Sequence, residues 1–284
     1  MGNKLYLVDV FAQRSYVGNP LAVVVGEKFL PDETMQAIAA EMNFSETTFV
    51  LSRPEDNGAY RVRIFTPSRE IEFTGHPILG TAWVIRHHVA QEPSAQISLN
   101  LAVGRVPVSF EPSADDREVA WFVAPSMSFG AIAKCEPVAA ALGLSPQDIA
   151  SDSPIQVVSA GTSAMIVPLR NLDALQHGKL DLDAFSELAA VGFPPLTYLY
   201  SHETHNPENN LCARFFFEAH GVREDPATGN GAAFLGAGVH AYYASNRATE
   251  YGMTGANIAD LGRECQSMAP MLGGVGAILL LMGR

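Results

Sequence analysis

Two stretches of similar design decide the fold: TGHPILGTAW at residues 74–83 and TGNGAAFLGA at residues 228–237. Each opens with a Thr-Gly pair and continues with apolar residues on nearly every side of the helix that their spacing predicts. A helix that is apolar nearly all round lies in a core. The glycines Gly75 and Gly229 are separated by about half of the 284-residue chain. We therefore expect two similar α+β halves, each with strands wrapped around one central helix.

The residues around these helices are typical of strands. Residues 60–65 alternate apolar side chains with arginine, as a half-buried strand does. The first half is predicted to cover residues 1–117, with its central helix at 75–88. The second half is predicted to cover residues 118–284, with its central helix at 229–243. Strands near the chain ends are expected to be able to cross from one half to the other.

The composition is that of a well-packed globular chain. Apolar residues make up 48% of it, charged residues make up 17%, and the net charge is -12. Such a composition is not that of a disordered protein. An acidic chain repels nucleic-acid phosphates, so we expect no nucleic-acid partner.

Neither end of the sequence carries a targeting or membrane signal. The first apolar run is short and Asp9 interrupts it, unlike a signal peptide. The apolar run at 275–282 is far shorter than the roughly 20 residues that span a bilayer. We expect a cytoplasmic protein with no membrane partner.

Cofactor signatures are missing from the sequence. It contains no phosphate loop of the GxxxxGK[ST] type, no HExxH, no GxSxG and no GxGxxG. No CxxC pair occurs among the three scattered cysteines, Cys135, Cys212 and Cys265. A disulfide framework or a structural zinc site is therefore disfavoured. We expect neither a metal nor an organic cofactor.

Glu46 and His76 are candidates for acid–base chemistry. Glu46 lies where a predicted helix gives way to an apolar strand, and burial there would raise its pKa into a useful range. From the local sequence alone, a solvent-exposed glutamate at a helix end is the favoured interpretation. His76 stands at the start of a buried helix, where free N–H groups bind anions. It either relays a proton or only caps the helix.

The third candidate is the turn around Asp225, which precedes the second buried helix. Asp225 either caps this turn or polarises His76 and holds a substrate amine. Gly229, Asn230 and Gly231 allow a ligand to approach backbone N–H groups closely. If the two helix starts face one another, they form a site for a small anionic molecule.

Five motifs follow one another along the chain: GNPLAVV at 18–24, SETTFV at 45–50, RIFTP at 63–67, GHPILGTA at 75–82 and EDPATG at 224–229. In this order they resemble the PhzF family of phenazine-biosynthesis-like isomerases and epimerases. The resemblance covers roughly residues 5–243. It implies a diaminopimelate-epimerase-like fold, in which each half is a β-barrel-like mixed sheet around a central helix and the site lies between the halves. It also implies a homodimer.

The resemblance implies cofactor-independent proton transfer on a small anionic substrate. Glu46 matches the family's acid/base glutamate, and His76 and Asp225 match its cleft histidine and aspartate. The substrate-binding positions that the family implies are Ser45, Gly75, Gly229 and Asn230. Asn230 departs from the family's common serine, so specificity is expected to shift. The tail after about Tyr243 also departs from the family, and no site residue is assigned there.

We expect a PhzF-like isomerase or epimerase that moves a proton on a small amino- or hydroxy-carboxylate, with Glu46 as general acid/base. One alternative is a non-catalytic small-molecule binding protein on the same scaffold. Another is a racemase that uses one cysteine with Glu46. Two-thiol racemases of this superfamily carry a cysteine at each helix start, where this chain has Gly75-His76 and Gly229-Asn230.

Overall fold

A computed structural model describes residues 2–12, 16, 18–92, 94–112, 118–122, 127–160, 162–205, 209, 211–216, 224–225, 228–229, 231, 235 and 278–282. These residues belong to two compact units. Most of the predicted second central helix, residues 229–243, lies outside the described residues. So does the tail after Tyr243, apart from residues 278–282.

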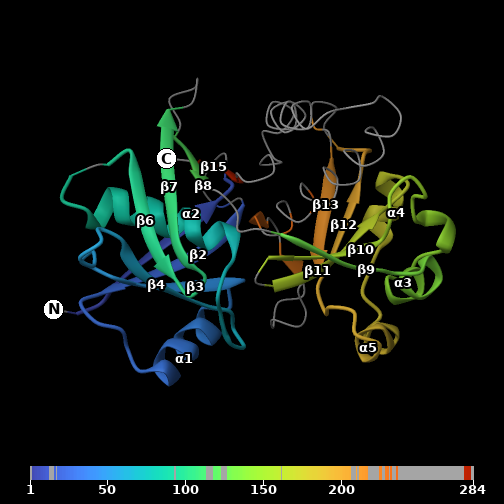
Figure 1. The fold of residues 1–284 in the computed structure, drawn as a ribbon, viewed down its shortest axis with the longest axis horizontal. Helices are drawn as coiled ribbons and strands as arrows, with labels where there is room; N and C mark the ends of the chain where they lie inside the picture. Colours follow the sequence, from blue (N-terminus) through green and yellow to red (C-terminus); the bar gives the residue numbers. More distant parts are fainter. Residues whose placement is uncertain are drawn as a thin grey trace. The chain divides into compact units, whose positions relative to one another are not determined.

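The first unit contains one mixed sheet (Figure 1). Its strands follow one another across the sheet in the order β1 (Lys4–Val10), β2 (Asn19–Gly26), β3 (Glu46–Leu51), β4 (Tyr60–Phe65), β6 (Gln96–Leu101), β7 (Gly104–Pro112), β8 (Glu118–Phe122) and β15 (Ile278–Met282). The short strand β5 (Glu70–Ile71) pairs with β4. Neighbours are parallel in β2–β3 and β4–β6 and antiparallel in the other pairs.

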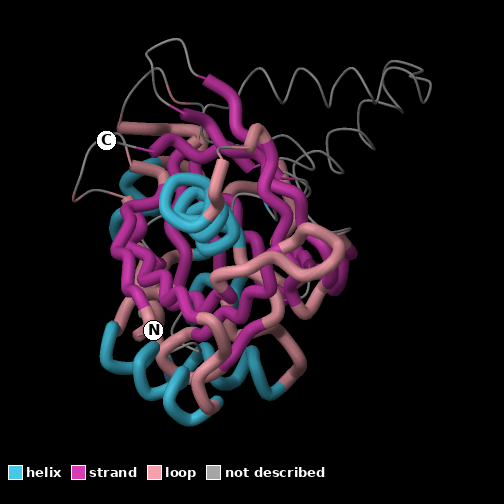
Figure 2. The backbone as a smooth tube through the Cα atoms, turned by 90° about the vertical axis from the view of Figure 1, so that its left-hand side faces the viewer, coloured by secondary structure: helices cyan, strands magenta, loops and turns pink. Residues whose placement is uncertain are grey.

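The sheet of the first unit wraps around α2 (Gly75–Val84), which continues as a π-helical turn, η1 (Ile85–Val89). Strands from both ends of the sheet order approach α2, and β15 comes close to β1. Figure 2 looks onto this unit and shows strands on several sides of the helix. The helix is buried along its length, with only Trp83 partly exposed. The apolar pattern of residues 74–83 predicts a helix in a core, and α2 lies inside its own sheet as predicted.

Glycine allows the sheet to close tightly on α2. A Cβ atom added at Gly80 would lie 2.7 Å from Leu21 Cδ2 and 2.8 Å from Val10 Cγ2. Residues 21–23 of β2 have no exposed surface, as expected of a strand covered on both faces. Helix α1 (Asp32–Met42) makes the crossover between the parallel strands β2 and β3, and Met35 packs with Phe49 and Phe65.

The predicted residue ranges of the two halves, 1–117 and 118–284, stay a prediction. In the structure, β8 pairs with β7 of the first unit, and β15 pairs with β8. The first unit also includes β14 (Glu224–Asp225). It is therefore assembled from three separate segments of the chain.

The second unit contains a mixed sheet with helices packed against it. Its strands follow the order β13 (Cys212–Phe216), β12 (Thr197–Ser201), β11 (Thr162–Pro168), β10 (Gln156–Ala160) and β9 (Ser128–Ile132). The helices are α3 (Cys135–Ala141), α4 (Leu172–His177) and α5 (Leu182–Ala190), with a 3-10 turn, η2 (Pro146–Asp148). Val138, Phe185 and Leu199 belong to its buried core.

Within the part of the chain that the structure describes, no helix is both long and apolar enough to span a membrane. The two sheets and their few short helices confirm the predicted α+β class.

The packing of α2 makes Leu79 a sensitive position. Its side chain has no exposed surface, whereas the side chain of Leu7 in β1 is 62% exposed. We expect Leu79→Ala to lower the free energy of unfolding by about 2–5 kcal/mol, because it leaves a cavity in the core. The matched change Leu7→Ala should alter it by about 0.5 kcal/mol or less. Urea unfolding followed by circular dichroism measures both, and equal losses would contradict the central placement of α2.

Candidate active site

The amino ends of two parallel strands place the first site residues. Glu46 opens β3 and lies opposite Leu21 of β2. Asn19 opens β2 and Ser45 directly precedes β3, so both lie at the same end of the sheet. The start of α2 brings His76 to this end, and β14 supplies Asp225.

Three ionisable side chains meet at this end of the sheet and are withdrawn from solvent. Glu46 and His76 have no exposed surface, and Asp225 is 4% exposed. His76 Nε2 lies 3.4 Å from Glu46 Oε2. One ligand atom of each of the three residues lies within 4.8 Å of the other two. The favoured local interpretation of Glu46, a solvent-exposed residue at a helix end, is therefore wrong, because the wrapped sheet covers it.

Hydrogen bonds hold Asp225 in place. The Ser45 hydroxyl donates to Asp225 Oδ1 over 2.8 Å, and Asn19 Nδ2 donates to the same oxygen over 2.6 Å. Thr228 hydrogen-bonds the carboxyl as well. Asn19 Nδ2 also lies 3.2 Å from His76 Nδ1. Asn19 and Thr228 were not among the predicted site residues, although GNP at 18–20 and the Thr-Gly pair at 228–229 are sequence signals for them.

Burial shifts the pKa of all three ionisable groups toward their neutral forms. Burial, and next the charge of Asp225, raise the pKa of Glu46 well above its ordinary value, and the Thr74 hydroxyl partly opposes this rise. Burial raises the pKa of Asp225 to about 6, against the hydrogen bonds from Ser45, Asn19 and Thr228. Burial lowers the pKa of His76 to about 3.

These shifts fix the order in which the three groups become charged. His76 is neutral, because its pKa lies far below 7. Asp225 has several hydrogen-bond donors for its carboxylate, whereas neither carboxyl oxygen of Glu46 has a hydrogen bond of good geometry among the described residues. Of two coupled carboxyl groups, the one with fewer donors retains the proton to higher pH. Asp225 is thus the first of the two carboxyl groups to ionise, and Glu46 keeps its proton to higher pH.

The two glycines that open the signature stretches lie against one another. A Cβ atom added at Gly229 would lie 2.9 Å from Gly75 Cα and 3.2 Å from the backbone nitrogen of His76. Only glycine fits such an approach of two backbones. The structure therefore brings together six of the predicted site residues: Glu46, His76, Asp225, Ser45, Gly75 and Gly229. The seventh, Asn230, lies outside the described residues.

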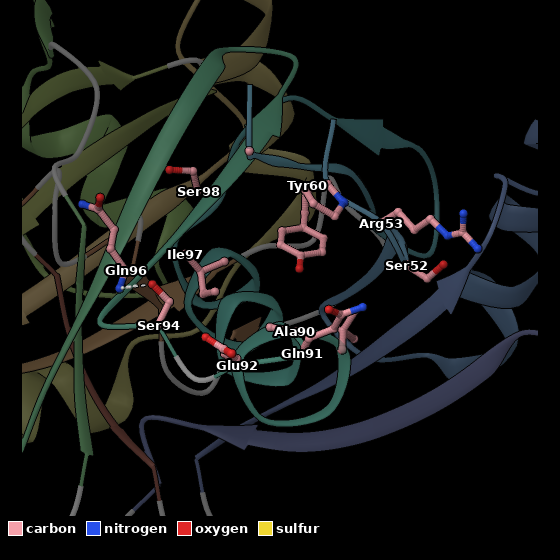
Figure 3. Close-up of a pocket in the computed structure, with 13 residues that line it drawn as sticks. Ser52, Arg53, Tyr60, Ala90, Gln91, Glu92, Ser94, Gln96, Ile97 and Ser98 are labelled. Atoms are coloured by element: carbon pink, nitrogen blue, oxygen red, sulfur yellow. Dashed lines mark hydrogen bonds between the residues drawn. The ribbon is translucent and has the colours of Figure 1, made fainter. Parts of the chain in front are cut away.

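A surface pocket of the first unit is separate from this group. It has a volume of about 730 Å³ and lies among the ends of β3, β4 and β6 and the segment after η1. Tyr60, Gln91 and Ser98 line it (Figure 3). Neither Glu46 nor His76 nor Asp225 contributes to its wall. The pocket is thus no part of the candidate active site.

The described cysteines do not occupy the helix starts of this site. Cys135 opens α3 and Cys212 opens β13, both in the second unit. Burial is the first cause that raises the pKa of each thiol, which disfavours the reactive thiolate. Cys265 lies outside the described residues.

Comparison with known proteins identifies relatives that match most of the chain. The family profile "Phenazine biosynthesis-like protein" matches residues 8–269. An uncharacterized isomerase of Mesorhizobium japonicum is 39% identical over 246 residues, which cover 82% of this chain and 80% of that protein. The trans-2,3-dihydro-3-hydroxyanthranilate isomerase of Pseudomonas aeruginosa is 35% identical over 234 residues, 81% of this chain and 77% of that enzyme.

A solved structure shows the same fold. The crystal structure of a phenazine biosynthesis protein of the PhzF family from Bacillus anthracis superimposes with a TM-score of 0.74 at 28% identity, over 86% of this chain and 81% of that one. The predicted diaminopimelate-epimerase-like fold is confirmed, and so is the prediction of an enzyme of the isomerase class. With a matching profile over most of its length and relatives above 30% identity, the chain belongs to the phenazine biosynthesis-like (PhzC-PhzF) family.

Proposed function

We propose that the chain is a cofactor-independent isomerase in which Glu46 moves a proton between two carbon atoms of a small amino- or hydroxy-carboxylate. The observation that carries this proposal is the carboxyl group of Glu46. It is fully buried, and its oxygens have no hydrogen bond of good geometry among the described residues. A general acid or base must keep a lone pair or proton for the substrate and have a pKa near the working pH.

The proton transfer conserves the number of protons on enzyme and substrate. The carboxylate form of Glu46 takes a proton from one carbon and becomes the carboxylic acid. The electron pair of the broken C–H bond moves into the substrate's π system. Glu46 then returns the proton to a second carbon and is again a carboxylate. Its raised pKa makes the carboxylate a stronger base than an ordinary glutamate.

Helix starts supply a binding site for the substrate carboxylate in this proposal. The first N–H groups of α2, at Gly75 and His76, have no partner within the helix. They combine free donors with the positive end of the helix dipole, an arrangement that favours anions. Gly229 packs directly against the backbone of Gly75 and His76, with no side chain between them. The same donors stabilise negative charge that develops on the substrate.

The name of one relative supports the proposed substrate class. The Pseudomonas aeruginosa relative is named for trans-2,3-dihydro-3-hydroxyanthranilate, a compound with an amino, a hydroxyl and a carboxylate group. That compound is therefore the first substrate to test. A non-catalytic binding protein on this scaffold would bind it and leave its C–H bonds intact. A cysteine-dependent racemase is less well supported, because the described cysteines open α3 and β13 and not the start of α2.

Glu46→Gln tests the proposed role directly. We expect turnover to fall by about 10²–10⁴-fold or more, because an amide cannot carry the proton. The substrate should still bind within a few fold, because the helix N–H groups are unchanged. Proton NMR in D₂O measures both isomerisation and the uptake of deuterium from solvent into C–H positions.

The matched control is Glu41→Gln, which makes the same change at an exposed residue of α1 and should keep full activity. If Glu46→Gln retained wild-type turnover, Glu46 would not be the acid/base. If the wild-type protein bound the compound and neither converted nor deuterated it, the binding-protein alternative would hold for this substrate.

Ser45→Ala tests the charge assignment. Without the hydroxyl, the carboxylate of Asp225 loses a donor, so we expect its pKa to rise above about 6. The rise should be about one pKa unit or more, since a hydrogen bond to a charged group contributes about 1.5–3 kcal/mol and 1.36 kcal/mol corresponds to one unit. Carbon-13 NMR of the Asp225 carboxyl against pH measures it.

Ser98→Ala is the matched control for this experiment. Ser98 is also buried, but its hydroxyl accepts from Arg105 in β7. The pKa of Asp225 should therefore stay at its wild-type value in Ser98→Ala. An unchanged or lower pKa in Ser45→Ala would contradict the assignment of Asp225 as the stabilised carboxylate.

A further inference from the structure

The GNP motif at residues 18–20 places a buried amide in the active site, and the proposed proton transfer does not use it. Asn19 has no exposed surface. Gly18 has a φ of +90°, and a Cβ atom added there would lie 2.3 Å from the carbonyl oxygen of Val10. The backbone before Asn19 thus requires glycine. This conformation fixes where the Asn19 side chain enters the site.

The nitrogen of the Asn19 amide contacts two site residues at once. Asn19 Nδ2 lies 2.6 Å from Asp225 Oδ1 and 3.2 Å from His76 Nδ1. An amide nitrogen has two hydrogens and no acceptor capacity. The carboxylate oxygen of Asp225 takes one hydrogen, which also sets the orientation of the amide. The second hydrogen is directed to His76, so His76 Nδ1 is the acceptor in this contact.

This contact determines where the imidazole carries its proton. A neutral imidazole has one N–H and one acceptor nitrogen. His76 is neutral because it is fully buried. With Nδ1 as the acceptor, the proton is on Nε2. That nitrogen faces Glu46 Oε2 at 3.4 Å.

We propose that Asn19 is a positioning residue that holds His76 as the Nε2–H tautomer, so that His76 acts as a hydrogen-bond donor beside Glu46 and not as a second base. The assignment of the tautomer rests on the geometry of Asn19 alone. Its consequence for catalysis, that Glu46 is the sole proton carrier of this pair, rests on the proposed function.

The same contact bears on metal binding. Glu46, His76 and Asp225 are close enough together to hold one ion. A histidine that binds a metal through Nε2 gives its Nδ1 proton to an acceptor. Asn19 presents a donor to Nδ1, so Nε2 keeps its proton and has no lone pair for a metal. With this tautomer of His76, the three side chains favour proton transfer over metal binding.

The wild-type protein allows a direct test. Two-bond nitrogen–proton correlation spectra of the protein labelled with ¹⁵N-histidine distinguish the two tautomers and the charged imidazolium. His76 is assigned as the signal missing from His76→Asn. We expect the Nε2–H tautomer at pH 7. The Nδ1–H tautomer or the imidazolium at this pH would overturn the proposal. The measurement needs no substrate, so it stands even if the proposed reaction is wrong.

Asn19→Asp inverts the contact with almost no change of shape. The oxygen that replaces the amide nitrogen carries at most one hydrogen, and it donates this hydrogen to the carboxylate of Asp225. The same oxygen can then only accept a hydrogen bond from His76, so we expect the tautomer of His76 to reverse to Nδ1–H. We expect kcat to fall by about 10²-fold or more, the scale of a lost acid–base contribution. KM should stay within a few fold, because Asn19 is not placed in substrate binding.

Asn57→Asp is the matched control, since it makes the same substitution at an exposed residue of the first unit. It should change neither the tautomer of His76 nor kcat. A folded Asn19→Asp protein with the wild-type tautomer would overturn the proposal. If Asn19→Asp does not fold, the wild-type spectrum decides. Reversal of the tautomer in a protein without any isomerase activity would support the role of Asn19 and refute the proposed function.

Discussion

Two carboxyl groups and an imidazole are buried together in one site. Because a buried charge is costly unless it is hydrogen-bonded, the first unit must supply hydrogen-bond donors at this site. An isolated charge in such a place is destabilising by several kcal/mol unless it is paired or hydrogen-bonded. Asp225 meets this requirement through donors from Ser45, Asn19 and Thr228. Glu46 has fewer donors, and burial raises its pKa well above the ordinary value. The unequal distribution of donors thus makes Asp225 easier to ionise than Glu46.

The fold brings the residues of this site together from distant parts of the chain. Parallel pairing of β2 with β3 aligns the strand starts at Asn19 and Glu46, since parallel neighbours begin at the same edge. The helix enclosed by the sheet begins at this edge and supplies His76. Asp225 arrives from a segment that lies 180 residues beyond Ser45 in the sequence and joins the first unit. The close approach of Gly229 to Gly75 fixes the place of this returning segment.

The sequence predicted the site better as a set of motifs than as isolated residues. The pattern around Glu46, taken locally, favoured an exposed helix end, because nothing within ten residues reveals that a sheet will close over it. Motif order identified Glu46, His76 and Asp225 together, and the structure places them together. Asn19 was not predicted, because its partners are 57 and 206 residues away and no local pattern encodes that pairing. Strands β8 and β15 illustrate the same limit: β8 pairs with β7 of the first unit, and β15 joins the same sheet by pairing with β8.

The proposed role of Glu46 as the single proton carrier has a stereochemical consequence that would separate this site from two-thiol racemases. Racemisation removes a proton from one face of a carbon and delivers another to the opposite face, which requires two groups on opposite sides of the substrate. Here Asp225 accepts hydrogen bonds from Ser45 and Asn19. In the proposed mechanism Asn19 holds His76 as a donor, and Glu46 alone exchanges a proton with the substrate. A carboxyl group fixed at the start of β3 would then return the proton to the face from which it was taken, at another carbon. The arrangement of donors thus favours the shift of a double bond over the inversion of a centre.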